Sequence, residues 1–146
     1  MADWTNPIYD RTQADVDYAK EQLSKGINTR EYKGCFNPLD ANRVENNTRY
    51  IADALNRLYY FNKITTINTW YKYSFIYSAH IERIINNINT LWKAYYTPTG
   101  SATLPTTLTH YEHANAIEKN LNLLKRMIDD MESSFRECGT FECMEE

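Results

Sequence analysis

The strongest chemical grouping in the sequence is a set of histidines and carboxylates, His110, Glu112, His113 and Glu118. His110 and His113 are three residues apart, so on a helix both imidazoles can face the same way and bind zinc together with a carboxylate. The set lacks the H-E-x-x-H spacing that places two imidazoles and a general base on one helix face. The histidines also stand at the expected start of a helix, where composition is loosely constrained, and this explanation is favoured over a metal site. We therefore predict no metal site and no cofactor.

Cysteine chemistry is also weakly indicated. The three cysteines, Cys35, Cys138 and Cys143, are too few for a disulfide framework or for a zinc site made of cysteine alone. Cys138 and Cys143 could close a small disulfide, but they lack the two-residue spacing of a redox motif, and the alternative is a pair of reduced thiols in an acidic tail. No Gly-rich phosphate loop and no G-x-S-x-G string occurs. We therefore predict no catalytic residues and no enzymatic activity.

Composition excludes two classes of partner. The 146 residues include 16 Lys+Arg and 19 Asp+Glu, a formal charge of -3, which argues against a protein that binds nucleic acid. No apolar run approaches the roughly 18 residues needed to span a bilayer, and the N-terminal residues do not resemble a secretory signal, so no membrane association is expected. Only 4 Gly and 4 Pro are present, which favours long helices over a turn-rich β-sandwich.

The pattern of caps and breakers predicts a mainly α fold, a bundle of about four helices preceded by an extended N-terminal arm. Between the second and third helices the β-branched run of residues 62–69 lowers helix propensity, and a short strand is the alternative there. The expected helices span residues 12–25, 38–61, 74–96 and 109–136. The expected organisation is an arm over residues 1–11, a helical bundle domain over 12–137 and a flexible C-terminal tail over 138–146.

Two of the expected helices carry apolar residues that step alternately by three and four, which is the spacing of a heptad seam. Such a seam is a narrow stripe and needs facing helices, supplied by the same chain, by further copies of it, or by both. Self-association through these seams is therefore expected alongside packing within the bundle. The seam residues are Ile81, Ile84, Ile88 and Leu91 in the third helix and Ile117, Leu121, Leu124 and Ile128 in the fourth.

A related string recurs in the three later helices. When Val44, Ile84 and Ile117 are superposed, three asparagines coincide, Asn47, Asn87 and Asn120. An asparagine three positions after a core residue lies at the edge of the seam, where its amide can bond a neighbouring helix end or fix the register. The string thus predicts an internal repeat with structural asparagines, and the alternative is a polar helix face in a chain that is rich in asparagine.

Aromatic residues are denser than one small core can hide, with 14% Phe, Trp and Tyr and 12 tyrosines. Tyr and Trp suit interfaces because a ring covers much apolar area at low entropic cost and keeps a polar group. We expect these rings to bury against other copies or neighbouring proteins, and the alternative is a platform that stacks on a receptor sugar. The interface candidates are Trp4, Tyr9, Tyr59, Tyr60, Trp70, Tyr73, Trp92 and Tyr95.

Two strings in the first third of the chain resemble a known family. They are D-R-T-Q-A-D-V at residues 10–16 and K-G-C-F-N-P-L-D-A-N-R-V-E at residues 33–45. They are similar to the opening of small phage and prophage proteins of Gram-positive bacteria, in which D-R-T-Q-A-D-V precedes K-G-x-(Y/F)-N-x-x-D-x-N-R-V. The short link over residues 27–32 departs from that family and affects the placement of the first two helices.

The resemblance implies a structural protein of the virion tail module, and no catalytic residues come with it. We therefore expect a non-enzymatic protein of a phage or phage-like particle, synthesised in the host bacterial cytoplasm and then located in the virion. Its expected partners are other tail, baseplate or fibre-attachment proteins and further copies of itself. The alternative is a receptor- or glycan-binding module at the distal end of the tail.

Overall fold

The computed structural model describes residues 2–145, with side chains as far as Ser134. It contains four helices and, within those residues, no strand, so the expected mainly α architecture is confirmed and the alternative strand near residues 62–69 is absent. The helices are α1 (Gln13–Ser24), α2 (Pro38–Arg57), α3 (Ser78–Ala94) and α4 (Tyr111–Glu145). None of the described helices is long and apolar enough to cross a membrane.

The first two helices begin where local sequence chemistry favours a start. Thr12 and Asp15 form a capping box at α1, in which the Thr12 N–H donates to Asp15 Oδ2 at 2.9 Å. Backbone and side-chain bonds from Thr12 lower the pKa of the Asp15 carboxyl. At α2 the Asn37 N–H donates to Asp40 Oδ2 at 2.8 Å, and Pro38 occupies the first turn, where its missing N–H needs no partner.

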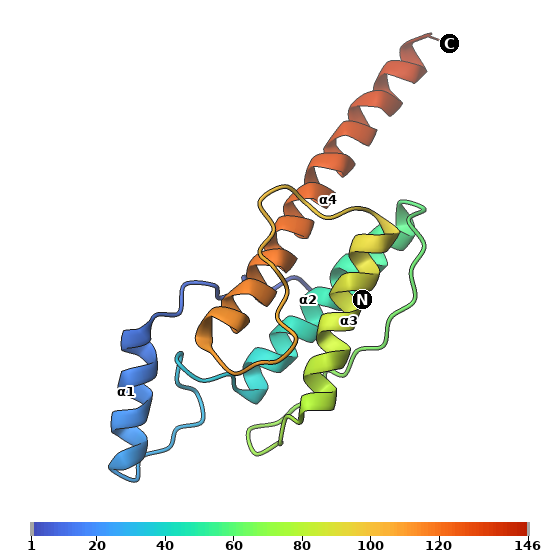
Figure 1. The fold of residues 1–146 in the computed structure, drawn as a ribbon. Coiled ribbons are helices and arrows are strands. Elements are labelled where there is room, and N and C mark those ends of the chain that lie inside the picture. Colours follow the sequence, from blue (N-terminus) through green and yellow to red (C-terminus); the bar gives the residue numbers. More distant parts are fainter. Residues whose placement is uncertain (1, 146) are drawn as a thin grey trace.

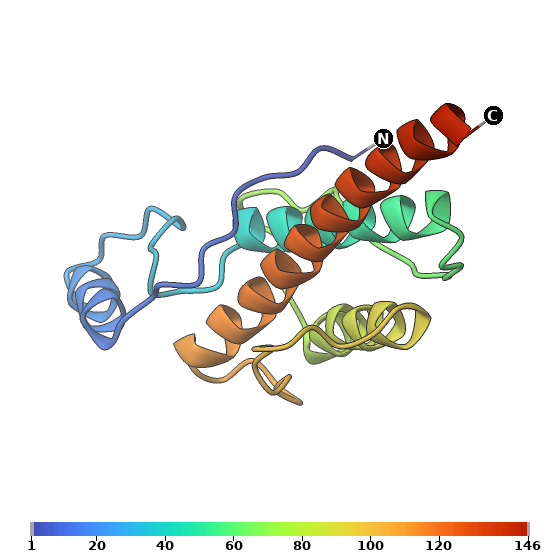
Figure 2. The same cartoon turned by 90° about the horizontal axis from the view of Figure 1, so that it is seen from above.

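The helices α2, α3 and α4 run in the same general direction (Figures 1 and 2). Arg43 near the start of α2 contacts Glu118 near the start of α4, whereas the rings of Tyr60 and Tyr95, just beyond the ends of α2 and α3, lie 4.7 Å apart. Parallel helices cannot be joined by short turns, so residues 58–77 and 95–110 run back along the bundle as non-helical connections. The arm over residues 2–12 is likewise non-helical.

All eight seam residues are buried, with exposed fractions of 7% or less. They join Val44, Ile51 and Leu55 of α2 in one hydrophobic cluster that draws on all three parallel helices. Half-buried side chains from the connections and the arm, including Trp4, Ile64 and Leu104, pack against this cluster. These eight residues are therefore covered within one chain, and none of them is exposed for contact with a second copy.

Three helix boundaries differ from expectation by more than two residues. α2 ends at Arg57 rather than near residue 61, because Leu58 caps it and Tyr59 adopts a left-handed conformation with φ 68°. α3 begins at Ser78 rather than 74, because residues 71–74 form a tight turn in which the Ser74 N–H donates to the Tyr71 carbonyl at 2.8 Å. α4 continues to Glu145 beyond the expected end at 136, and no proline interrupts that stretch.

The backbone of α4 thus covers residues 138–145, where a tail was expected. The side chains of Cys138 and Cys143 lie outside the described part of the chain, so their possible disulfide stays a prediction. Among the described side chains, Cys35 is a free, half-buried thiol. Burial, reinforced by the charge of Asp40, raises the pKa of this thiol, so it stays protonated at neutral pH.

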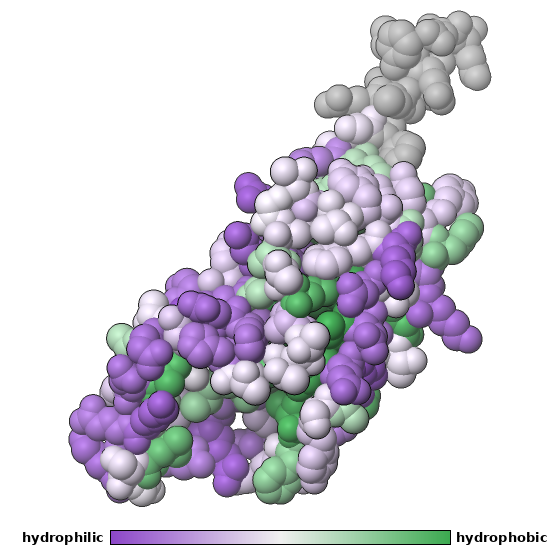
Figure 3. All heavy atoms as spheres, viewed as in Figure 1, coloured by the Kyte–Doolittle hydropathy of each residue, from purple (hydrophilic) through white to green (hydrophobic). Residues whose placement is uncertain are grey.

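α1 lies to one side of the three parallel helices (Figure 1), and only Ala19 of α1 is buried. Its backbone contacts Gly34: a Cβ built on Gly34 would overlap the Asp15 carbonyl and the Val16 nitrogen. A glycine at this position allows the close approach. The face in Figure 3 is hollowed in its lower part, where α1 stands apart from the bundle.

Candidate functional site

A buried ion network joins the N-terminal arm to the starts of α2 and α4. Glu118 is fully buried and lies 2.9 Å from Arg11 Nη2 and 2.6 Å from Arg43 Nε. Asp40 also contacts both guanidinium groups. Two positive and two negative groups therefore neutralise one another inside the fold, the condition under which buried charge is tolerated. Burial opposes the charge on Arg43, but the bonds to Glu118 and Asp40 outweigh it and raise the pKa of the guanidinium.

Arg11 is the part of this network that the arm contributes. Its side chain also donates to the carbonyl of Lys33 at 3.1 Å and to that of Ile8 at 2.7 Å. In return, the Ile8 N–H donates to Glu118 Oε1 at 3.1 Å. The arm is thus held by hydrogen bonds from side chains to its backbone groups and by the ion pairs of Arg11.

Asparagine amides hold the extended segments to the helices by pairing with one residue's N–H and C=O together. Asn47 of α2 accepts from the Thr5 N–H at 2.9 Å and donates to the Thr5 carbonyl at 2.8 Å. Asn120 of α4 does the same to Ala102, at 2.8 and 2.9 Å. The amide thereby satisfies both polar groups of a residue that no strand pairs.

The third asparagine of the repeat, Asn87 of α3, donates to the Thr65 carbonyl at 2.8 Å. Each of these asparagines therefore bonds an extended segment of the chain. The string in the sequence allowed a neighbouring helix end as one possible partner. Their register follows the superposition that the sequence suggested. The interpretation as a merely polar helix face is wrong, because Asn47, Asn87 and Asn120 are all buried.

Two more positions of the repeated string have matching roles. Asn42 and Asn115 each pair with both polar groups of one residue, Trp70 and Arg11 respectively. Three residues after each of these asparagines stands a buried glutamate, Glu45 or Glu118. Glu45 accepts from the Ile67 N–H at 3.1 Å and the Trp70 indole at 2.7 Å, as Glu118 accepts from Ile8.

The arginines of the string link one helix to the next. Arg43 of α2 bonds Glu118 of α4, and the equivalent Arg83 of α3 bonds Glu45 of α2 at 2.6 Å. The arm therefore spans α2 and α4, and the segment of residues 62–70 spans α3 and α2 in the same way. The segment of residues 102–108 begins at Asn120 of α4 and lines a cavity together with Glu82 and Ile85 of α3. Glu82 and Ile85 occupy the positions at which the string has its asparagine and its glutamate. The chain is thus an approximate threefold repeat of an extended segment and a helix.

Nine of the described aromatic side chains are exposed. Two of them, Tyr9 and Tyr18, lie on the arm and on α1, and the other seven gather at the two ends of the parallel helices. Beyond the helix C-termini lie Tyr59, Phe61 and Tyr96, which we call the C-end cluster. Before α3 lie Tyr71, Tyr73, Phe75 and Tyr77, which we call the aromatic loop. Tyr59 is 81% exposed and Phe75 is 76% exposed, values far from those of core aromatics. Exposed apolar groups at this density are typical of interaction surfaces.

The predicted interface residues divide between exposed and internal positions. Tyr9, Tyr59 and Tyr73 are exposed, whereas the other five are half-buried. Trp4 packs on Tyr50, with Lys125 over the same ring, and Tyr60 packs on Tyr95. Trp70, whose indole donates to Glu45 of α2, and Trp92, which packs against the hydrophobic cluster, are both half-buried. The interface role of this set stays a prediction, and exposure favours the aromatic loop and the C-end cluster.

The histidine and carboxylate grouping does not assemble. Glu118 belongs to the buried ion network, His113 Nδ1 accepts from the Thr109 N–H at 3.2 Å, and His110 lies 3.8 Å from Glu112. Within the described part of the chain no three His, Cys, Asp or Glu side chains are grouped so that they could hold a metal ion.

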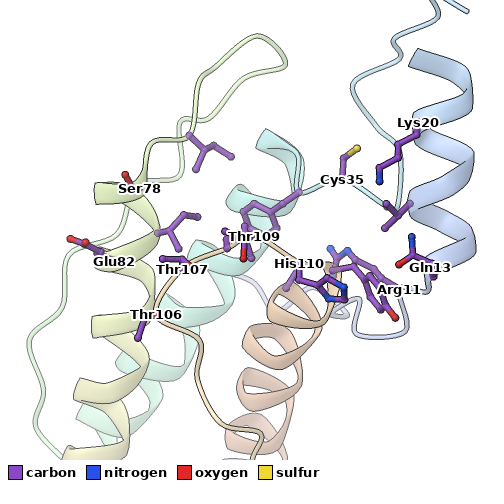
Figure 4. Close-up of a pocket in the computed structure, with 18 residues that line it drawn as sticks. Arg11, Gln13, Lys20, Cys35, Ser78, Glu82, Thr106, Thr107, Thr109 and His110 are labelled. Atoms are coloured by element: carbon purple, nitrogen blue, oxygen red, sulfur yellow. The ribbon is translucent and has the colours of Figure 1, made fainter. Parts of the chain in front are cut away.

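His110 instead borders a cavity of about 680 Å³ between α1 and the starts of α3 and α4. Figure 4 shows Lys20 on the α1 side of this cavity and Glu82 on the α3 side. Its walls include the apolar side chains of Val16, Phe36 and Ile81. The cavity separates α1 from α3, so α1 is attached to the bundle chiefly through the arm and the Gly34 contact.

Comparison of the chain with protein-family models, with curated proteins and with solved structures gives no match.

Proposed function

We propose that this chain is a non-enzymatic structural protein of a phage or phage-like particle. It forms assembly interfaces in the tail, baseplate or fibre-attachment region and resides in the virion after synthesis in the host cytoplasm. Its partners in this proposal are neighbouring virion proteins and further copies of the chain. The two N-terminal strings motivate the particle, and the exposed aromatic side chains motivate the interfaces.

The observation that carries the interface role is the exposure of the aromatic loop next to a fully covered core. The core needs no partner, because its seams are buried within the chain. The aromatic loop is held in shape by the turn at residues 71–74, in which the Tyr71 N–H donates to Ser74 Oγ at 3.0 Å. An ordered loop that presents rings to water loses little conformational entropy on binding, which suits a docking surface.

The proposal is tested by incorporation into particles. The double variant Tyr73→Ser/Phe75→Ser is expected to fold, because both rings are more than half exposed, and to be lost from purified particles by mass spectrometry. The matched control is Leu39→Gln, which replaces an apolar side chain of α2 that is 53% exposed and leaves the aromatic loop intact. Equal incorporation of both variants, or absence of the unaltered chain from particles, overturns the proposal.

A further inference from the structure

The three extended segments are held alike but connected differently. The segment of residues 62–70 is joined to the bundle at both ends, by α2 and by α3, and residues 102–108 lie likewise between α3 and α4. The arm, in contrast, is joined to a bundle helix only through residues 12–37, which contain α1. Among the described residues it is the one segment of the three that can leave its site without unfolding a parallel helix.

The site that holds the arm, which we call the arm clamp, consists of Asn47, Asn115, Glu118, Asp40 and Arg43. Without the arm these residues carry two negative charges and one positive charge, so Glu118 and Asp40 share the single guanidinium of Arg43. Two carboxylates that share one counter-charge in a largely enclosed site are unfavourable. The arm clamp therefore requires an extended segment that brings an arginine to the position of Arg11.

The second segment has no comparable requirement. Its buried glutamate, Glu45, takes its counter-charge from Arg83 of α3 and not from the segment itself. Glu45 receives only a backbone N–H and the Trp70 indole N–H from residues 62–70, and no charged group. Charge complementarity thus makes the arm clamp selective for this arm, and a second copy of the chain offers the same arm.

The connection that follows α1, residues 25–31, has the features of a hinge. Residues 25–31 are all exposed, and two of them, Gly26 and Arg30, have left-handed φ angles of 76° and 60°. α1 contacts residues 32–34 beyond the connection through Asp15, Val16 and Tyr18, and these contacts pass to the other copy when α1 moves together with the arm. Arg30 also lies over the ring of Tyr73 at 4.7 Å, so this connection adjoins the aromatic loop.

We propose that the arm clamp is a site between subunits, in which the arm of one copy occupies the clamp of another in the assembled state. The proposal rests on the assembly role proposed above. Exchanged and closed forms contain the same clamp contacts, so their free energies differ only by the connection, the association entropy and new contacts between copies. Exchange places the connections and the adjoining aromatic loops of two copies near one another, where the rings supply those new contacts.

Cross-linking between differently substituted copies tests the exchange. Tyr9 of the arm and Asn122 of α4 are outside the arm clamp, and their side chains lie 3.5 Å apart. In a background with Cys35, Cys138 and Cys143 changed to Ser, one tagged copy carries Tyr9→Cys and a differently tagged copy carries Asn122→Cys. After co-expression and treatment with a short bismaleimide, a two-tag product in excess of the yield from random collision marks an exchanged arm.

The matched control uses the second segment. Thr66 and Arg49 are joined by a side-chain bond of 3.2 Å, but the segment that carries Thr66 is tied at both ends. We expect a two-tag product from the Tyr9→Cys and Asn122→Cys copies and none from copies with Thr66→Cys and Arg49→Cys. A chain with both Tyr9→Cys and Asn122→Cys shows that the reagent spans the pair.

Two results overturn the exchange. One is cross-linking confined to single chains, and the other is an equal two-tag yield from both pairs, which indicates random collision. Light scattering on the same samples measures whether the copies associate. Association without a two-tag product refutes the exchange of arms but leaves the proposed assembly function standing. That function is tested separately, by the incorporation of the aromatic variants into particles.

Discussion

Arg43 and Glu118 make a two-point contact between α2 and α4. Arg43 Nε lies 2.6 Å from Glu118 Oε1, and Arg43 Nη2 lies 2.9 Å from Oε2. Paired bonds of this kind fix the orientation of both groups as well as their distance. Because Arg11 reaches the same carboxylate from the arm, one side chain determines how three distant parts of the chain meet.

Removing the charge of Glu118 is the first test of this relationship. Glu118→Gln leaves Arg11 and Arg43 with Asp40 as their one carboxylate and turns an amide N–H toward a guanidinium. We expect the free energy of unfolding to fall by about 3–5 kcal/mol, the usual cost of breaking a buried pair. Urea denaturation measures it.

Glu21→Gln is the matched control, because it breaks an exposed pair with Lys25, whose side chain is 55% exposed. Its cost should be about 0.5 kcal/mol or less. Similar losses in the two variants would show that the buried network contributes no more than a surface pair.

The core could be predicted from sequence because its signal is local and periodic. Ile84, Ile88 and Leu91 follow one another at helical spacing, and nothing beyond the third helix is needed to recognise their shared face. The repeat of Asn47, Asn87 and Asn120 was visible for the same reason. The partners of these asparagines could not be predicted. Their amides bond backbone groups, which every residue has, so nothing in the sequence of the bound segment marks it as the partner.

The ion network shows what spacing cannot reveal. Glu118 stands near two histidines in sequence, which suggested a metal ligand, but the fold turns it toward Arg11 and Arg43, residues 107 and 75 positions away. The sequence carries no signal for the burial of Arg11, because an arginine just before a helix cap is usually exposed to solvent. Tertiary contact alone distinguishes these cases.

Neighbouring asparagines of α3 provide a test of the backbone-binding amides. Asn87→Asp loses the bond donated to the Thr65 carbonyl and places a carboxylate oxygen against that carbonyl, so we expect a loss of about 1–3 kcal/mol. Asn86→Asp alters an exposed side chain one residue earlier and should change stability by about 0.5 kcal/mol or less. Denaturant midpoints compare the two, and equal midpoints would contradict a structural role for Asn87.

The contact between Gly34 and α1 predicts a local effect of a methyl group. In Gly34→Ala the new Cβ meets backbone atoms of Asp15 and Val16, which cannot rotate away, so α1 has to shift. We expect destabilisation of about 1–3 kcal/mol and faster proteolysis within residues 13–33 than within α2. In Gly100→Ala no atom lies within 4 Å of the new Cβ, and only the backbone angle is strained. Unchanged cleavage near α1 in Gly34→Ala would remove the basis for this prediction.

Tyr95 predicts how stability changes in alkali. Burial, a hydrogen bond with Tyr96 and the charges of Tyr96 and Tyr60 raise its pKa from 10.0 to about 12. The folded state therefore keeps a proton that the unfolded state has lost, so the stabilisation is complete below pH 10.0 and is lost as the pH rises to about 12. Urea midpoints at pH 9 and pH 11 should fall more steeply with pH for the unaltered protein than for Tyr95→Phe. The exposed Tyr59→Phe is the control, and a Tyr95→Phe variant with the same pH dependence as this control would show that Tyr95 carries no such linkage.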